Sequence, residues 1–245
     1  IVMLLEVKNI KKSFGGVKAI KGSTFNIEEK RITALIGPNG AGKTTLFNII
    51  TGLLKADEGE IQFRGETITQ LKPHDIANFG ISRTFQQVRL FRYLSVYDHL
   101  RMVENNEDTK IIKNIFKKDK RKVDIYEKIL KDIGIDRGID TLVSELSYGQ
   151  RKLLNIAMAL RKPHHLLMLD EPVAGVNTVV QEKIEELLQS LKEKGETILL
   201  IDHDMGFVRT LADHVIVLDA GVVITQGKPE EVLNDPKVLE AYLGE

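Results

Sequence analysis

Residues 37–45 read Gly-Pro-Asn-Gly-Ala-Gly-Lys-Thr-Thr and match the phosphate-loop pattern G-x-x-x-x-G-K-[ST]. Because glycine has no Cβ, the backbone N–H groups of such a loop can turn inward towards phosphate oxygens. Lys43 supplies a positive charge for the β- and γ-phosphates, and the Thr44 hydroxyl can ligate Mg²⁺. The alternative is an ordinary glycine turn before a helix, and the adjacent Lys43 and Thr44 argue against it. We expect every residue of the loop to contact a nucleotide: Gly37, Pro38, Asn39, Gly40, Ala41, Gly42, Lys43, Thr44 and Thr45.

Two adjacent carboxylates, Asp170 and Glu171, follow the apolar run 165–169. A buried strand that ends in Asp brings the carboxylate to the C-terminal edge of a sheet, where open α/β sheets bind their ligands. Asp170 is placed to hold Mg²⁺ directly or through water, and Glu171 to accept a proton from an attacking water. Acidic residues at strand ends also cap the following helix. The phosphate loop makes the catalytic interpretation the stronger one.

The segment 146–150, Leu-Ser-Tyr-Gly-Gln, opens a stretch whose apolar residues recur at helical spacing up to Leu160. Ser147 is a good N-cap residue, and capping alone would explain it. Its place after a phosphate loop and just before the Asp-Glu strand gives a second interpretation. In this order the segment resembles the LSGGQ signature of ATP-binding-cassette (ABC) ATPases, with Tyr148 in place of the usual first glycine.

The resemblance to ABC ATPases extends over nearly the whole chain and implies roles for further residues. Gln86 occupies the position of the glutamine that contacts Mg²⁺ and the attacking water, and His203 that of the switch histidine at the γ-phosphate. Phe14 occupies the position of the aromatic residue that stacks on adenine, although an aromatic residue at a strand end is more often part of a core. The family pairs two such domains head to tail. The resemblance therefore implies that Ser147, Gly149 and Gln150 close over ATP held by a second ATPase subunit.

Within the family, the chain resembles the ATPase subunits of branched-chain amino-acid importers. The motifs Arg-Thr-Phe-Gln at 83–86, Ala-Gly-Val-Asn at 174–177 and the sequence from Asp235 to the end carry this narrower resemblance. The chain departs from common family patterns at Asn177, where many ABC ATPases have Asp. It departs again at Asp202, where Glu often precedes the switch histidine, and at Thr178, where Pro often stands.

The elements that must position these residues alternate between strand and helix. Short apolar strands are expected at 4–10, 23–27, 31–36, 60–64, 80–85, 165–169 and 197–201, with helices after the phosphate loop and around 126–133, 153–160 and 184–191. This order predicts an α/β fold. We expect a P-loop NTPase core of the ABC type with an N-terminal antiparallel β part and an inserted helical subdomain. Residues 1–245 then form one domain, with the core at 1–86 and 161–245 and the helical subdomain at 87–160.

Composition excludes several classes. The formal net charge is +0, so no overall field favours nucleic acid, and no nucleic-acid partner is expected. The chain has no cysteine, which excludes disulfides and suits the cytosol. No apolar run approaches the roughly 18 residues that span a bilayer. The resemblance to importer ATPases then implies a cytoplasmic protein, peripheral on the inner face of the cell membrane, with separate integral membrane permease subunits that supply the span and, indirectly, a substrate-binding protein.

Three functions remain open at this stage. The chain can power a branched-chain amino-acid importer, another ABC transporter such as a lipid or lipopolysaccharide exporter, or a soluble machine acting in DNA repair or on ribosomes. The ATPase dimer can be a homodimer or a pair of paralogues. We expect the region from Gln86 through the helical insertion to dock a cytoplasmic helix of a membrane subunit, although its apolar side chains, including Val88, Leu90, Phe91 and Tyr93, also suit a core. We interpret the lysine-rich run 110–122 as the solvated face of a short helix and loop. The less favoured alternative is a contact with anionic lipid.

Overall fold

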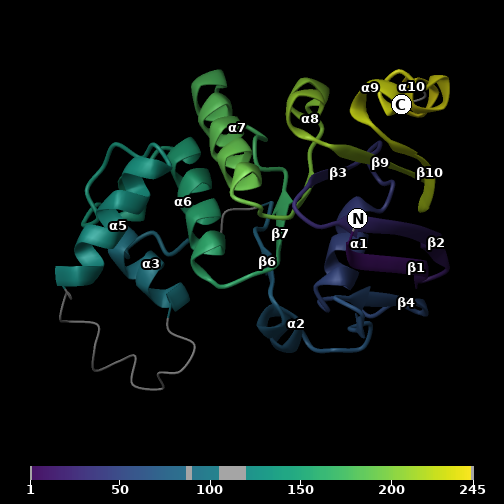
Figure 1. The fold of residues 1–245 in the computed structure, drawn as a ribbon, viewed down its shortest axis with the longest axis horizontal. Helices are drawn as coiled ribbons and strands as arrows, with labels where there is room; N and C mark the ends of the chain where they lie inside the picture. Colours follow the sequence, from purple (N-terminus) through teal and green to yellow (C-terminus); the bar gives the residue numbers. More distant parts are fainter. Residues whose placement is uncertain (1, 87–89, 105–119, 244–245) are drawn as a thin grey trace. The chain divides into compact units, whose positions relative to one another are not determined.

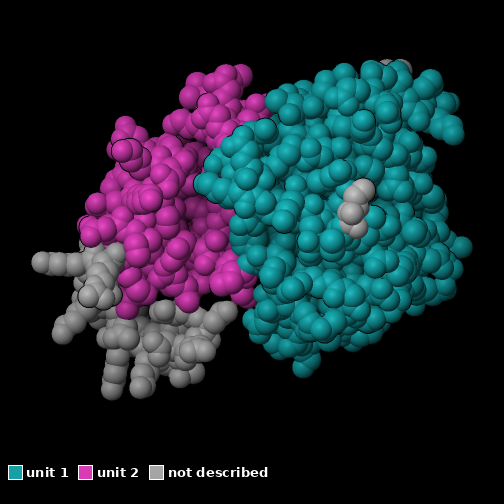
Figure 2. Space-filling view, in the orientation of Figure 1, with its two compact units in different colours: residues 1–83, 164–174, 188–245 teal, residues 84–163, 175–187 magenta. Residues whose placement is uncertain are grey.

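The computed structural model describes residues 2–86, 90–104 and 120–243. The chain forms two compact units (Figure 2). Unit 1 consists of residues 1–83, 164–174 and 188–245, and unit 2 of residues 84–163 and 175–187. Val88 and most of the lysine-rich run lie outside the described residues. Unit 2 includes residues 175–187, which the sequence division at 87–160 did not, and the assignment of 1–245 as a single domain stays a prediction.

A six-stranded sheet forms the centre of unit 1, in the order β10-β9-β3-β8-β7-β6 (Figure 1). Its strands are β3 (Ile32–Ile36), β6 (Ile81–Arg83), β7 (Leu166–Asp170), β8 (Ile198–Ile201), β9 (His214–Asp219) and β10 (Val222–Gly227). All neighbours pair in parallel except β9 and β10, which are antiparallel. Every residue of β3, β7 and β8 is buried, which agrees with the continuous apolar runs of their sequences. The mainly parallel α/β core predicted from the sequence is confirmed.

The parallel register brings three chain segments to one edge of this sheet. Asp170, the last residue of β7, pairs with Ile201, the last residue of β8. On β3, the last residue that pairs with β8 is Ala34, and the strand ends two residues later at Ile36, on the same side of the sheet. The phosphate loop leaves β3, Glu171 leaves β7, and Asp202 and His203 leave β8. Parallel strands therefore deliver the residues that the sequence analysis singled out to a common C-terminal edge.

A second, antiparallel sheet of unit 1 has the order β2-β1-β4-β5 and confirms the predicted N-terminal β part. Its strands are β1 (Met3–Phe14), β2 (Val17–Glu28), β4 (Glu58–Phe63) and β5 (Glu66–Thr67). β1 and β2 are longer than the expected strands 4–10 and 23–27. Gly15 and Gly16, both at positive φ, form a tight turn that lets the two strands pair up to Phe14 and Val17, beyond the apolar runs.

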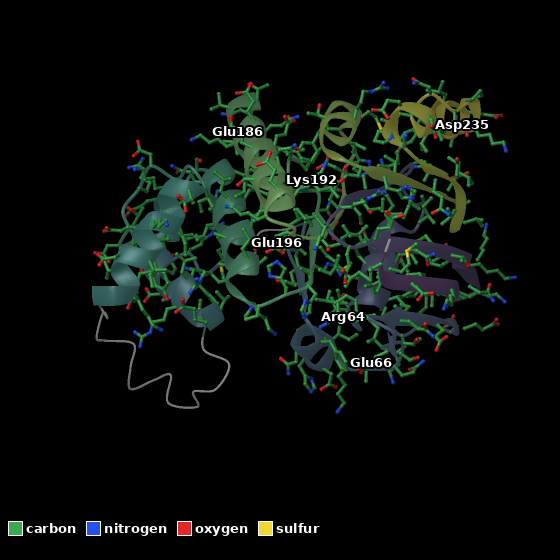
Figure 3. All side chains as sticks on the ribbon, in the orientation of Figure 1. Arg64, Glu66, Glu186, Lys192, Glu196 and Asp235 are labelled. Carbon is green, nitrogen blue, oxygen red and sulfur yellow. The ribbon has the colours of Figure 1, made fainter. Side chains whose placement is uncertain are left out.

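Helices of unit 1 complete its core. They are α1 (Lys43–Ile50), α2 (Pro73–Phe79), α8 (Met205–Leu211), α9 (Pro229–Val232), α10 (Pro236–Leu243) and the C-terminal part of α7 (Thr178–Glu193). α1 buries Leu46, Phe47, Ile49 and Ile50, as its helical spacing predicts. Near the end of α7 lies Lys192, which is labelled in Figure 3. Its Nζ donates to Asp213 Oδ1 at 2.7 Å.

Unit 2 is helical, as expected for the insertion. It contains α3 (Val96–Glu104), α5 (Lys120–Asp132), the short 3₁₀ turn Val143–Glu145, α6 (Tyr148–Arg161) and the start of α7. The buried rings of Tyr97 and Tyr126 meet edge to face, with centroids 5.2 Å apart. The Tyr126 hydroxyl donates to Glu104 at 2.6 Å, and Arg161 forms an ion pair with the same carboxylate. No helix among the described residues of either unit is long and apolar enough to cross a bilayer.

The antiparallel sheet yields a test of close backbone packing at two glycines that share positive φ. A Cβ on Gly59 would lie 2.4 Å from the Asn9 carbonyl oxygen, whereas a Cβ on Gly65 would meet nothing within 4 Å. Gly65→Ala should cost about 1 kcal/mol from left-handed strain alone. Gly59→Ala should cost about 1–3 kcal/mol more, because backbone must move. Denaturant unfolding of both variants measures the difference, and equal losses would contradict the packing.

Candidate functional site

The phosphate loop lies between β3 and α1, and its two ends are packed tightly against β9 and β2. A Cβ on Gly37 would lie 1.9 Å from the Leu218 carbonyl oxygen, and one on Gly42 would lie 2.5 Å from Ile20 Cδ1. Gly42 is also the N-cap of α1, at φ 104°. Gly40 in the middle of the loop has no atom within 4 Å of a Cβ position. The ends of the loop thus require glycine for packing, while its middle faces open space.

Lys43 is held across this loop. Its Nζ donates to the carbonyl oxygens of Gly37 at 2.6 Å and Pro38 at 2.8 Å, and the side chain is buried. The Gly37 N–H donates to the hydroxyl of Tyr242, on α10, at 2.7 Å. Sequence analysis missed Tyr242, because nothing local connects residue 242 with the loop. The C-terminal helix therefore supports the first residue of the loop.

Asp170, the last residue of β7, is buried and forms an ion pair with Arg83. The Arg83 Nη2 donates to Asp170 Oδ2 at 2.9 Å. Burial lowers the pKa of Arg83, and the hydrogen bond and charge of Asp170 oppose that shift. Asp170 offers a carboxylate and Thr44, exposed at the start of α1, offers a hydroxyl. These hard oxygen donors are the kind that Mg²⁺ takes together with substrate phosphates, so the donor set fits that ion.

Glu171 and His203 contact each other, which the sequence did not predict. His203 Nε2 lies 3.2 Å from Glu171 Oε1. Glu171 has φ 49°, a left-handed conformation uncommon for a residue other than glycine. Its N–H donates to the Ile201 carbonyl oxygen at 2.8 Å, so the turn is fixed to the end of β8. The two side chains proposed for proton and γ-phosphate chemistry therefore meet just beyond the sheet edge.

Asp202, noted as a departure from the family pattern, joins these two turns. Its buried carboxylate accepts hydrogen bonds from the backbone N–H groups of Val173 at 3.3 Å, His203 at 2.8 Å and Asp204 at 3.1 Å. The pKa of Asp202 is raised, chiefly by burial and also by the charge of Glu171, although the three N–H donors lower it. One carboxylate thus connects the chain after Glu171 with the chain at His203. The signal in the sequence was an acidic residue between an apolar strand and a histidine.

Phe14 ends β1 and is 45% exposed, so the interpretation of this residue as part of the core is wrong. The Lys12 Nζ lies 5.6 Å from the centre of its ring. An exposed aromatic face is what stacking on adenine requires. The adenine contact itself stays a prediction.

Unit 2 carries the remaining predicted residues. Ser147 is the N-cap of α6: its Oγ accepts from the Gln150 N–H at 3.2 Å, while Gln150 Oε1 accepts from the Ser147 N–H at 3.0 Å. This reciprocal capping box confirms the structural role of Ser147. Gly149 is buried, and a Cβ there would lie 2.7 Å from Val180 Cγ2 at the start of α7. Gln86 is exposed. Contact of these residues with nucleotide stays a prediction.

Comparison with known proteins agrees with this arrangement. Residues 20–174 match the family model of the ABC transporter. The probable branched-chain amino acid transport ATP-binding protein LivG of Archaeoglobus fulgidus is 38% identical, over 98% of this chain and 95% of that protein. The crystal structure of the ADP conformation of an ABC transporter cassette has a TM-score of 0.88 and 35% identity, with both chains fully covered. A dimeric bacterial ABC transporter cassette has a TM-score of 0.76 and 26% identity, over 92% of this chain and 99% of that one.

The chain therefore belongs to the ATP-binding subunits of ABC transporters, a family of nucleotide-binding ATPases. The fold class and this family were both expected from the sequence, and both are confirmed. Residues 222–245 match, in addition, the model described as the branched-chain amino acid ATP-binding cassette transporter. That segment contains β10, α9 and α10, and thus Tyr242, which supports Gly37.

The capping box leads to a stability prediction. Ser147→Ala should lower the free energy of unfolding by about 1 kcal/mol, because the Gln150 N–H loses its acceptor. Thermal or denaturant unfolding measures the loss. Ser144→Ala is the matched control, an exposed serine just before the signature, and should change stability by less than about 0.5 kcal/mol. Equal effects of the two substitutions would remove Ser147 from the capping role.

Proposed function

We propose that this chain hydrolyses ATP to drive an importer of branched-chain amino acids through separate membrane subunits. The observation that carries the proposal is the convergence of the phosphate loop, Asp170 and the Glu171–His203 pair at one edge of the parallel sheet. The match of residues 222–245 to a branched-chain amino-acid cassette model supports the cargo. So does the LivG name borne by a relative that aligns along almost the whole chain.

Each residue receives a role that its position supports. The loop from Gly37 to Thr45 cradles the phosphates with backbone N–H groups, the dipole of α1 and the charge of Lys43. Thr44 and Asp170 would hold Mg²⁺, which neutralises charge on the phosphates, and the resemblance to the family implies Gln86 as a further ligand. Phe14 stacks on adenine.

Glu171 accepts a proton from the attacking water, and His203 orients that carboxylate and contacts the γ-phosphate. The 3.2 Å contact between them keeps the base aimed at one place. Holding the proton acceptor in a fixed geometry, in a strained but well anchored turn, removes the need to reorganise it during the reaction.

A second ATPase subunit completes the site in the proposal. Ser147, Gly149 and Gln150 of one subunit would close over the ATP held by the other, adding donors and excluding water. The dimeric cassette among the similar structures supports such a pair. A two-fold arrangement uses both sites equally, and the partner is either a second copy or a paralogue.

Permease subunits are the membrane partners in this proposal, and the chain is peripheral on the cytoplasmic side of the membrane. The proposed docking surface consists of Leu90, Phe91 and Tyr93, just after Gln86. Phe91 is 63% exposed and Tyr93 86% exposed. Below Phe91, the fully buried His99 accepts the Phe91 N–H at 3.0 Å and fixes the loop from inside. A fixed loop with outward aromatic side chains suits an amphipathic helix of a partner. A substrate-binding protein would act only through those subunits.

The carboxylate role is tested by Glu171→Gln. The amide cannot take the proton, so hydrolysis should fall by about 10²- to 10⁴-fold while ATP binding persists. A phosphate-release assay with a parallel binding titration separates the two effects. Glu182→Gln on the exposed face of α7 serves as the control and should hydrolyse ATP normally. Near-normal turnover of Glu171→Gln would exclude Glu171 as the base.

The dimer is tested in the Glu171→Gln background, where bound ATP should accumulate as a closed pair. Ser147→Arg should abolish this ATP-dependent dimer because a bulky cation occupies the place of the partner's phosphate. Ser147→Ala should retain the dimer and lose only capping stability. Size-exclusion chromatography with and without ATP distinguishes the outcomes, and a persistent dimer in Ser147→Arg would contradict the proposed contact.

The docking surface and the cargo are tested with the membrane subunits present. Phe91→Ala and Tyr93→Ala should weaken co-purification of the permease while leaving basal ATPase of the free subunit intact. Leu239 is an exposed apolar residue on α10. As the control, Leu239→Ala should change neither co-purification of the permease nor basal ATPase. Uptake of labelled leucine, isoleucine or valine into vesicles tests the cargo. Outward movement of a lipid would instead support the exporter, and co-purification with ribosomes or DNA the soluble machine.

A further inference from the structure

Arg83 is the last residue of β6 and contacts two other elements of unit 1 at once. Its Nη2 donates to Asp170 Oδ2 at 2.9 Å, at the end of the neighbouring strand β7. Its Nη1 donates to Asn48 Oδ1 on α1 at 2.8 Å and to Oγ1 of Thr51, the C-cap of α1, at 3.1 Å. The guanidinium carbon lies 5.3 Å from the centre of the Phe47 ring. One planar group therefore connects the phosphate-loop helix with the carboxylate at the sheet edge.

This network is buried and directional. The side chains of Arg83 and Asp170 are 5% and 2% exposed. A carboxylate in such a place needs a paired cation and hydrogen bonds to stay ionised. The guanidinium is a rigid fork that can bond Asp170 on one nitrogen and α1 on the other, which the single ammonium of a lysine cannot reproduce. Arg83 thereby fixes the orientation of Asp170 relative to the helix that begins with Lys43 and Thr44.

We propose that Arg83 is a positioning residue for the Mg²⁺ ligand set: it holds Asp170 at a fixed place relative to Thr44, so that the two oxygens can serve one ion. The inference rests on the proposed function, in which both residues hold Mg²⁺. Arg83 also stands three residues before Gln86 along the chain. The short segment that leads to Gln86, a further proposed Mg²⁺ ligand, thus begins at Arg83, which orients Asp170.

The charge of Arg83 and its positioning of Asp170 predict opposite changes in cation affinity when Arg83 is removed. If its positive charge were its only effect at the site, then losing it would strengthen binding of a cation there. If Arg83 positions Asp170, its loss weakens cation binding, and partners of metal ligands typically contribute about 10- to 100-fold in affinity. The sign therefore separates the two explanations.

The measurement is the Mg²⁺ advantage, defined as the dissociation constant of ATP in EDTA divided by that in excess Mg²⁺, obtained by calorimetry on the intact chain. Arg83→Met should lower the Mg²⁺ advantage by about 10- to 100-fold. Arg83→Lys should lower it less. Arg83→Met should have no further effect in an Asp170→Asn background, because the group it positions is already changed. Arg161→Met, which breaks the arginine–carboxylate pair with Glu104 in unit 2, should leave it unchanged.

An unchanged or increased Mg²⁺ advantage in folded Arg83→Met would overturn the positioning role. If Arg83→Met fails to melt cooperatively, Asn48→Ala provides the test: it keeps both charges and removes one anchor on α1. Asn48→Ala should then give a smaller drop, and no drop would reject the inference. If Asp170→Asn itself leaves the Mg²⁺ advantage intact, the proposed role of Asp170 fails. If Asp170→Asn lowers it while Arg83→Met does not, only the role of Arg83 fails.

Discussion

The parallel hydrogen bonding of β3, β8 and β7 is the constraint on which the rest of this protein depends. Each strand is buried along its whole length, so its backbone groups have to pair with its neighbours. Pairing in register puts the C-terminal ends of the three strands at one edge. The phosphate loop, the two carboxylates and the histidine leave from those ends. A slip by one residue would turn the side chain of Asp170 to the opposite face of the sheet.

Around this edge, the loops are fixed by interactions that come from elsewhere in the chain. Leu218 on β9 leaves no room for a Cβ at Gly37, and Tyr242 on α10 accepts the N–H of the same residue. Asp202 accepts N–H groups from the turns on both sides of it. These contacts restrict the loops before any ligand is bound. A site held in this way loses little conformational entropy when a nucleotide arrives.

Ser147 has a structural role in its own helix, and a second role is proposed for it. Its side chain caps α6 together with Gln150, so that the backbone N–H groups of both residues are paired at the start of the helix. A helix N-terminus of this kind favours anions. Gly149 is required within the unit because Val180 stands where its Cβ would be. The signature can therefore be explained by local structure alone, and its proposed contact with the nucleotide of a second subunit adds to that role.

The sequence by itself determined the class of the protein and supplied most of the residues proposed for its site. The phosphate loop, the Asp170-Glu171 pair and the signature are contiguous motifs, and alternating strands and helices predicted the mainly parallel sheet that the structure shows. Local patterns suffice here because each motif lies within one short stretch of chain: the phosphate loop and the Asp170-Glu171 pair follow the strand before them, and the signature begins a helix.

Only the tertiary structure decided how distant residues combine. It paired Arg83 with Asp170, Tyr242 with Gly37 and Glu171 with His203. It also extended β1 and β2 beyond their apolar runs and added residues 175–187 to unit 2. The three pairs, Glu171–His203, Arg83–Asp170 and Tyr242–Gly37, join residues that are 32, 87 and 205 positions apart. No periodicity or motif reports such pairs, because a side chain's partner across a fold is chosen by packing and by the need to pair buried charges and N–H groups.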